Sequence, residues 1–151
     1  MSSFARKSSL AAYHSVSVHG GVANADAHGM VQMLMDAAAE RMATARGCIE
    51  RGEITRKASL LHSCVTLIAE LRGNLNMTDG GPLAQNLSSL YEYMALQLML
   101  ANVENDLHKV TEALSLLNEI RSAWIAIGPE VRKAVPQAPP VAAMGAFASH
   151  G

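Results

Sequence analysis

Apolar residues recur along the chain at alternating intervals of three and four, the spacing typical of amphipathic helices. The pattern is clearest after Gly80-Gly81-Pro82, where two glycines predict the end of one helix and the proline predicts the start of the next. The helix predicted from Pro82 to about Asn102 has an apolar seam of Leu83, Leu87, Leu90, Met94, Leu98 and Ala101. Its further apolar residues, off that seam, are Tyr93, Leu96 and Leu100. A helix with two apolar faces has more surface to bury than an ordinary bundle position.

Three other segments show the same period, and they predict helices over residues 26–52, 53–75 and 106–128. The seam of the first is Val31, Leu34, Ala38, Met42, Ala45 and Ile49. Asp106 stands where a carboxylate can cap the first turn of the last helix, and Gly128-Pro129 is expected to stop it. Four helices of similar length joined by short links predict an all-α fold, an antiparallel up-down four-helix bundle.

Two segments without this periodicity flank the bundle, which is predicted to occupy residues 24–128. Residues 1–23 form a weakly patterned N-terminal arm with Tyr13 among its apolar residues, and Gly20-Gly21 is expected to interrupt regular structure there. Residues 129–151 form a Pro- and Ala-rich tail, which we expect to be a solvated extension.

The helix predicted over 53–75 has an apolar seam of Ile54, Ala58, Leu61, Val65, Ile68 and Leu75 and, beside it, a second apolar stripe. Its members are Leu60, Cys64, Leu67 and Leu71. If Leu75 lies opposite Pro82 in the hairpin, Cys64 faces Tyr93, and the two extra stripes occupy the same length of the hairpin. One interpretation is an apolar groove on the outside of the bundle, a surface that usually marks an interaction site. The other is a wide core stripe, since globular helices bury a broad arc, and periodicity alone leaves both open.

Composition narrows the class of protein. The net charge of −1 and the scattered Lys and Arg residues argue against a nucleic-acid partner. No apolar run approaches the ~20 residues that span a bilayer, and no apolar segment follows Arg6-Lys7 as in a signal peptide. Cys48 and Cys64 fit no metal spacing, so we expect buried, reduced thiols. The sequence therefore predicts a soluble cytoplasmic protein without membrane insertion.

Residues that could carry out catalysis do not form a recognisable set. The six histidines make no HExxH pair, and the glycine pairs make neither GxGxxG nor a P-loop. Glu40, Glu70, Glu112 and Glu119 lack the ExxH partners of a di-iron bundle. We expect no enzyme, no metal and no cofactor.

The stretch from Gly80 to Met94 resembles the signature of the flagellar export chaperone family FliS, a GG-x-[IL]-A-x-NL-x-x-LY-x-YM pattern. Further fragments agree in the same order over roughly residues 11–127. They are Ala12-Tyr13 for AY, Met33-Leu34-Met35-Asp36 for MLYD with methionine in place of tyrosine, Glu70-Leu71 for EL, Ala101-Asn102 for AN, Asn105-Asp106 for ND, Leu116-Leu117 for LL and Arg121-Ser122-Ala123-Trp124 for R-x-AW.

The resemblance implies an antiparallel helical bundle that binds the disordered C-terminal segment of flagellin (FliC) and keeps it from polymerising in the cytosol. It implies delivery to the gate protein FlhA of the flagellar type III export apparatus, and the anti-sigma factor FlgM or FliW as possible further partners. It also implies that the arm caps an apolar site, with Ala12 and Tyr13 as the cap. The expected partner-binding residues of the bundle are Leu60, Cys64, Leu67, Leu71, Tyr93, Leu96 and Leu100. The alternative from another class is a structural bundle or adaptor that self-associates through the same stripes.

Overall fold

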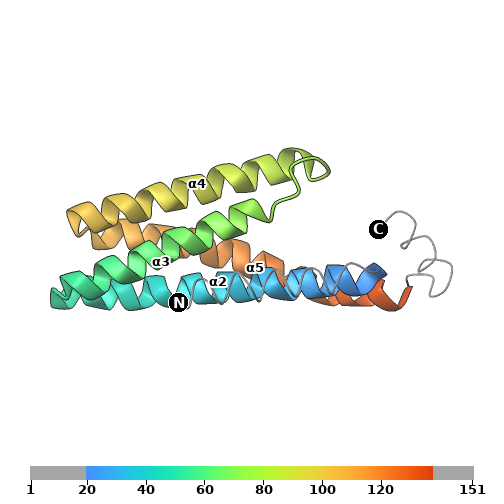
Figure 1. The fold of residues 1–151 in the computed structure, drawn as a ribbon, viewed down its shortest axis with the longest axis horizontal. Helices are drawn as coiled ribbons and strands as arrows, with labels where there is room; N and C mark the ends of the chain where they lie inside the picture. The colour runs from blue at the N-terminus through green and yellow to red at the C-terminus, as the bar shows by residue number, and fades with distance from the viewer. Residues whose placement is uncertain (1–19, 138–151) are drawn as a thin grey trace. The chain divides into compact units, whose positions relative to one another are not determined.

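The computed structural model describes the backbone of residues 20–137 and the side chains of residues 26–130. Over that range it contains helices and no strands (Figure 1). The helices are α2 (Gly20–Arg51), α3 (Ile54–Gly73), α4 (Gly81–Glu104) and α5 (Leu107–Gln137). The predicted all-α four-helix fold is confirmed, whereas the predicted capping arm, with Ala12 and Tyr13, lies outside the described residues.

Two compact units divide the described chain. Residues 33–122 hold the C-terminal part of α2, all of α3 and α4, and the first half of α5. Residues 20–32 and 123–137, from the outer ends of α2 and α5, make the other unit. The candidate site described below lies wholly within residues 33–122.

The link between α2 and α3 is a tight reversal at Gly52. Its φ of 71° is in the left-handed region, which glycine adopts without steric cost. The Glu53 amide donates to the Cys48 carbonyl at 2.9 Å, and the Gly52 amide donates to the Ile49 carbonyl at 3.2 Å. This pair of bonds satisfies carbonyls at the end of α2 and turns the chain back along it.

The link between α4 and α5 confirms Asp106 as a helix cap. Its Oδ1 accepts the amides of His108 at 2.9 Å and Lys109 at 3.3 Å. Burial raises the pKa of the Asp106 carboxyl, but the hydrogen bonds from Lys109 and His108 and the Lys109 charge lower it more, so it lies below its ordinary value. Asn105, with φ of 54°, ends α4 in the left-handed conformation.

Hydrogen bonds within residues 33–122 join α2 to both α3 and α5. The Cys64 thiol of α3 lies 3.7 Å from the Ala38 carbonyl of α2, and Arg121 of α5 pairs with Asp36 of α2 at 2.6 Å. The interior of this unit is built from medium-sized apolar side chains. They include Leu34, Ala38, Met42 and Ala45 on α2, Leu61, Cys64, Leu67, Ile68 and Leu71 on α3, Tyr91, Met94, Leu98 and Ala101 on α4, and Val110, Ala113 and Leu117 on α5.

Two predicted helix ends are wrong. Helix α2 begins at Gly20, six residues before the predicted start at Asp26, so Gly20-Gly21 does not interrupt it. Helix α5 continues through Gly128-Pro129 to Gln137. A glycine lowers the stability of a helix by only about 1 kcal/mol. A proline removes one backbone hydrogen bond, and a helix can continue past it. The division into arm, bundle and tail at 23 and 128 remains a prediction.

The N-terminal half of α4 also faces its neighbours differently from the predicted seam. Leu83 is 68% exposed, whereas Ala84, Ser88 and Tyr91 are buried. The buried line is displaced by one residue, about 100° around the helix. Further along, Met94, Leu98 and Ala101 of the predicted seam are buried as expected.

Candidate functional site

Three of the expected partner-binding residues lie in the interior. Cys64, Leu67 and Leu71, here called the interior set, are at most 2% exposed. The prediction that this stripe of α3 forms an outer groove wall is therefore wrong, and the wide-core interpretation holds for these residues. The reason is that α3 is rotated about its axis relative to the prediction. Its buried face is centred on the second stripe, and of the predicted seam only Leu61 and Ile68 are buried.

Cys64 and Tyr93 do not face each other across a groove, as the predicted pairing required. Cys64 is fully buried, and its thiol lies 3.7 Å from the Ala38 carbonyl of α2. Tyr93 is 41% exposed and contacts Glu112 of α5.

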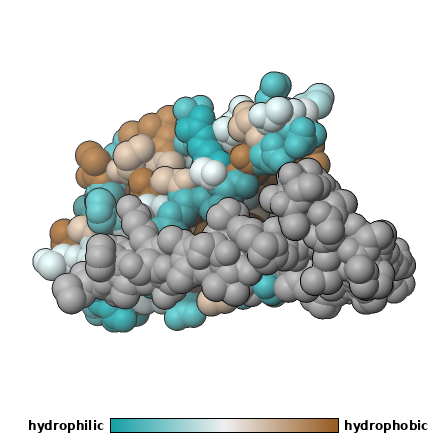
Figure 2. Space-filling model, turned by 45° about the vertical axis from the view of Figure 1, so that its right-hand side comes forward, coloured by the Kyte–Doolittle hydropathy of each residue, from teal (hydrophilic) through white to brown (hydrophobic). Residues whose placement is uncertain are grey.

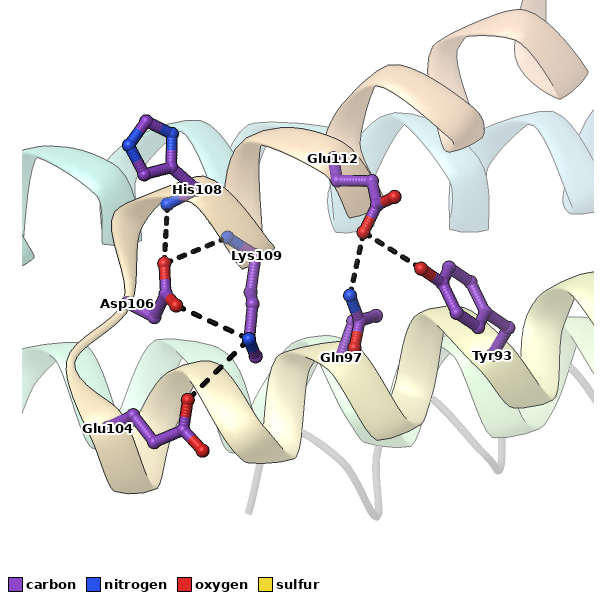
Figure 3. Close-up of polar contacts among 7 residues, drawn as sticks. All are labelled: Tyr93, Gln97, Glu104, Asp106, His108, Lys109 and Glu112. Carbon is purple, nitrogen blue, oxygen red and sulfur yellow. Dashed lines mark hydrogen bonds and ion pairs between the residues drawn. The ribbon is translucent and has the colours of Figure 1, made fainter.

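Tyr93 points to α5 rather than to α3. Its hydroxyl donates to Glu112 Oε1 at 2.9 Å, and Gln97 Nε2 donates to the same oxygen at 2.6 Å (Figure 3). The hydrogen bond to Glu112 raises the pKa of the Tyr93 phenol. Further along this edge, Lys109 Nζ lies 3.6 Å from Glu104 and 3.3 Å from Asp106. The α4–α5 edge is thus closed by polar contacts.

An open apolar groove lies instead on the outside of the hairpin, between α3 and α4. Its volume is about 690 Å³. It is lined by Val65, Ile68, Ala69, Arg72 and Gly73 on α3, and by Tyr91, Glu92, Ala95, Leu96 and Met99 on α4. Leu96 is the one expected partner-binding residue in this lining. The predicted outer groove therefore exists on this hairpin, but different α3 residues form its wall.

Large apolar side chains continue along α4 beyond the groove. Leu96, Met99 and Val103, here called the outer set, are 50%, 48% and 80% exposed. Figure 2 shows hydrophobic side chains gathered at the upper left, where Figure 1 places the C-terminal half of α4. Met99 and Val103 were not predicted as site residues, although the successive intervals of three residues from Leu96 to Met99 and four from Met99 to Val103 are the signal that could have found them.

The two remaining residues of the expected set are half-buried. Leu100 lies one helical turn from Leu96 on α4, and Leu60 lies on α3. Val65 lines the groove, and Leu60, five residues before it, lies about 140° around the helix from it. Leu60 therefore belongs to the other flank of α3.

One end of the groove is polar. Arg72 Nε donates to the Ser88 hydroxyl at 2.8 Å, and Arg72 Nη1 lies 3.5 Å from Glu92 Oε2. Ser88 is buried, and this hydrogen bond explains why a serine occupies the buried line of α4. The groove thus runs from a charged end at Arg72 to an apolar end at Met99.

A buried lysine joins the start of α3 to the end of α4. Lys57 is 2% exposed, and its ammonium donates to the Asn102 carbonyl at 2.8 Å and to Asn105 Oδ1 at 2.6 Å. The first of these acceptors is an end carbonyl of α4, where a cation is favourable. Periodicity did not predict this buried charge.

The thiols behave as predicted for structural cysteines, because Cys48 and Cys64 are both free and buried. Burial raises the pKa of the Cys64 thiol to about 12, against a smaller opposing effect of the Arg41 charge. Within the part of the chain that the structure describes, no cluster of His, Cys, Asp and Glu side chains could hold a metal ion. Nor does any helix of that part combine the length and hydropathy that crossing a bilayer requires.

The unit formed by residues 20–32 and 123–137 contains one reciprocal contact that the sequence did not reveal. The rings of His28 and Trp124 stack with centroids 4.5 Å apart. His28 Nε2 bonds to the Trp124 carbonyl at 2.7 Å, and Trp124 Nε1 donates to the His28 carbonyl at 2.9 Å. Both hydrogen bonds tie α2 to α5 in this unit.

Comparison with known proteins gives a consistent result. A family model described as "Flagellar protein FliS" matches residues 9–131, a range that includes every groove residue and also Ala12 and Tyr13. The flagellar secretion chaperone FliS of Vibrio cholerae is 39% identical over 124 residues, which cover 82% of this chain and 91% of that protein. The flagellar secretion chaperone FliSB of Pseudomonas aeruginosa is 41% identical over 112 residues, which cover 74% and 89%. FliS of Salmonella typhimurium is 36% identical over 124 residues, which cover 82% and 92%.

Proposed function

This chain belongs to the FliS family of flagellar secretion chaperones, and from that premise we propose that flagellin is the protein it binds. In this proposal it binds the disordered C-terminal segment of flagellin (FliC) in the cytosol and prevents premature polymerisation. It then delivers flagellin to the flagellar type III export apparatus, where FlhA is the receptor. FlgM or FliW are further proposed partners.

The observation that carries the proposal is the apolar groove between α3 and α4 with the outer set beside it. Exposed apolar side chains that continue along one helix are typical of an interaction site. A disordered segment loses conformational entropy when it binds, so it needs a large apolar surface to offset that loss. Coupled folding and binding typically buries on the order of 1,000–3,000 Å², so the groove serves as the first anchor of a longer contact.

The spacing of the outer set indicates how flagellin would lie. From Glu92 to Val103 the α4 face extends about 16 Å, or roughly three helical turns. An amphipathic helix with apolar residues at intervals of three and four fits such a surface. Leu96 and Met99 would contact it from α4, and Val65 and Ala69 from α3.

The N-terminal arm enters the proposal as a competing occupant of this surface. Ala12 and Tyr13 would shield apolar side chains until flagellin replaces them, since a tethered segment acts at a high effective concentration. We expect Tyr13→Ala to change the affinity or association rate for flagellin without unfolding the bundle. Equal affinity and equal rate in this variant would remove the arm from the mechanism.

The test is the stoichiometry of the complex. The purified chain is mixed with a synthetic peptide of the flagellin C-terminal segment and measured by calorimetry and by light scattering after size-exclusion chromatography. We expect a one-to-one complex. A stable homo-oligomer that ignores the peptide would contradict the proposal and favour a self-associating structural bundle.

A further inference from the structure

Arg72 stands where the apolar groove ends, and the groove chemistry changes there. Toward Met99 the wall is aliphatic, with Ala95 and Leu96 on α4 and Val65 on α3. At the other end the guanidinium of Arg72 lies beside the Glu92 carboxylate. A segment lying in the groove would therefore meet a charged group at one end only.

A hydrogen bond to α4 orients this guanidinium, although the Arg72 side chain is 46% exposed. Its Nε donates to the hydroxyl of Ser88, which is itself buried in the line of α4 residues that face the core. A side chain held in this way has already lost much of its rotamer freedom, so less is lost when it binds a ligand. The terminal nitrogens remain directed to Glu92 and the groove.

Glu92 is held much less firmly than Arg72. Its side chain is 67% exposed, and the closest approach to Arg72 is 3.5 Å, longer than a good charge-assisted hydrogen bond. Exposed ion pairs of this kind contribute little to stability. Another carboxylate could therefore take the place of Glu92 at small cost.

We propose that Arg72 binds a carboxylate of the flagellin segment and so determines which end of that segment lies at this end of the groove. The inference rests on the proposed function and adds a specificity-determining residue to the same site. Glu92 occupies the guanidinium in the free protein and is displaced on binding. The carboxylate, from an Asp or Glu side chain or from the end of the flagellin chain, lies about one helical turn away from the apolar residues that contact Leu96.

Either Glu92 or Arg72 could bind a charged group of flagellin at this end of the groove. A flagellin cation would have to pair with Glu92, whose exposed side chain would first have to be ordered. Arg72 is already ordered by Ser88 and offers two nitrogens in a fork that matches a carboxylate. The geometry therefore favours an acidic group.

A double-mutant cycle tests the proposal. Calorimetry of the full chain and its Arg72→Gln variant uses the flagellin C-terminal peptide and versions in which each Asp or Glu is changed singly to Asn or Gln. A further version has an amidated C-terminus, which separates the chain end from the side chains as the source of the carboxylate. We expect Arg72→Gln and one peptide change each to weaken binding about tenfold, and their combination to weaken it little more. Additive losses for every peptide would overturn the proposal.

Three variants provide the controls. Arg56→Gln removes the same charge from the exposed N-terminal turn of α3, away from the groove, and should leave affinity within about twofold. Arg72→Lys keeps the charge but loses the fork, so it should recover only part of the affinity. Glu92→Gln should strengthen binding, because it removes the competing carboxylate. A loss of affinity in Glu92→Gln would mean that flagellin presents a cation there, and would overturn the inference.

The proposed function and the inference fail in different ways. If the wild-type chain binds the peptide but no peptide change couples to Arg72, the inference alone is wrong. If the wild-type chain gives no binding signal with any peptide, the proposed function is wrong and the inference falls with it. Equal melting temperatures of the wild-type chain and Arg72→Gln would show that the lost affinity is not a loss of fold.

Discussion

The interior set of α3 and the outer set of α4 share one spacing, three residues and then four, but lie in opposite environments. The side chains of the interior set are buried, whereas those of the outer set are about half exposed or more. Both are aliphatic or sulfur-containing residues on adjacent helices of the same hairpin. Similar residues at similar spacing thus stabilise the fold in one place and remain available for binding in the other.

Periodicity therefore gives the faces of a helix but not the direction in which each face points. That direction depends on the neighbouring helices. Helix α3 lies between α2 and α4, as its contacts to Ala38 and Ser88 show, so little of its apolar surface remains open. Helix α4 is joined to α5 by the polar contacts of Tyr93 and Gln97, and its outer face is left uncovered by α3.

The largest expected effect is that of a charge placed in the interior set. Leu67→Glu puts an unpaired carboxylate into a fully buried position and should lower the free energy of unfolding by about 4 kcal/mol or more. Leu96→Glu, the same change in the outer set, should stay within about 0.5 kcal/mol of the wild type. Urea denaturation followed by circular dichroism measures both. Equal stabilities of the two variants would contradict the assignment of Leu67 to the interior and Leu96 to the surface.

A smaller loss is expected at Lys57, which continues the buried arc of α3 one turn before Leu61. Lys57→Met keeps the volume but leaves the Asn102 carbonyl and Asn105 amide oxygen without their donor, which should cost about 1–3 kcal/mol. Its exposed neighbour provides the control, since Arg56→Met should change stability by less than about 0.5 kcal/mol. Thermal and urea unfolding would show whether the two variants differ in this order.

A further effect is expected only at alkaline pH. Burial raises the pKa of the Cys64 thiol and of the Tyr91 phenol to about 12 each. Between about pH 9 and about 12 the unfolded chain therefore releases protons that the native chain retains. Since the native state then binds more protons, stability should be fully present below this range and fall as pH rises through it. Cys64→Ala should make the fall shallower in urea titrations, and an unchanged slope would show that the thiol is not sealed.

Much of the fold could be predicted because it depends on local chemistry. The seam of α2 at Leu34, Ala38 and Met42 was predicted from spacing alone and is buried. The cap at Asp106 was predicted because a carboxylate before a periodic segment has few other roles. The signature around Gly80 was sufficient to identify the family.

The details of the site depend on contacts between distant segments, so the sequence did not determine them. At the start of α4, helical spacing from either Leu83 or Ala84 gives a possible buried face. The structure buries the less apolar face, which begins at Ala84 and includes Ser88, the acceptor of the Arg72 hydrogen bond. The burial of Lys57 depends on acceptors 45 and 48 residues away. The groove wall consequently shifted from the predicted α3 stripe to Val65 and its neighbours.

The most direct test of the account is the affinity of two matched variants for the flagellin C-terminal peptide, measured by calorimetry. Leu96→Glu places a charge in the groove, whereas Leu83→Glu makes the same change at an exposed position of the same helix, outside the groove lining. We predict that Leu96→Glu weakens binding at least about tenfold, because a buried unpaired carboxylate is costly, and that Leu83→Glu leaves binding within about twofold. Equal affinities of the two variants would contradict the claim that flagellin binds in the groove between α3 and α4.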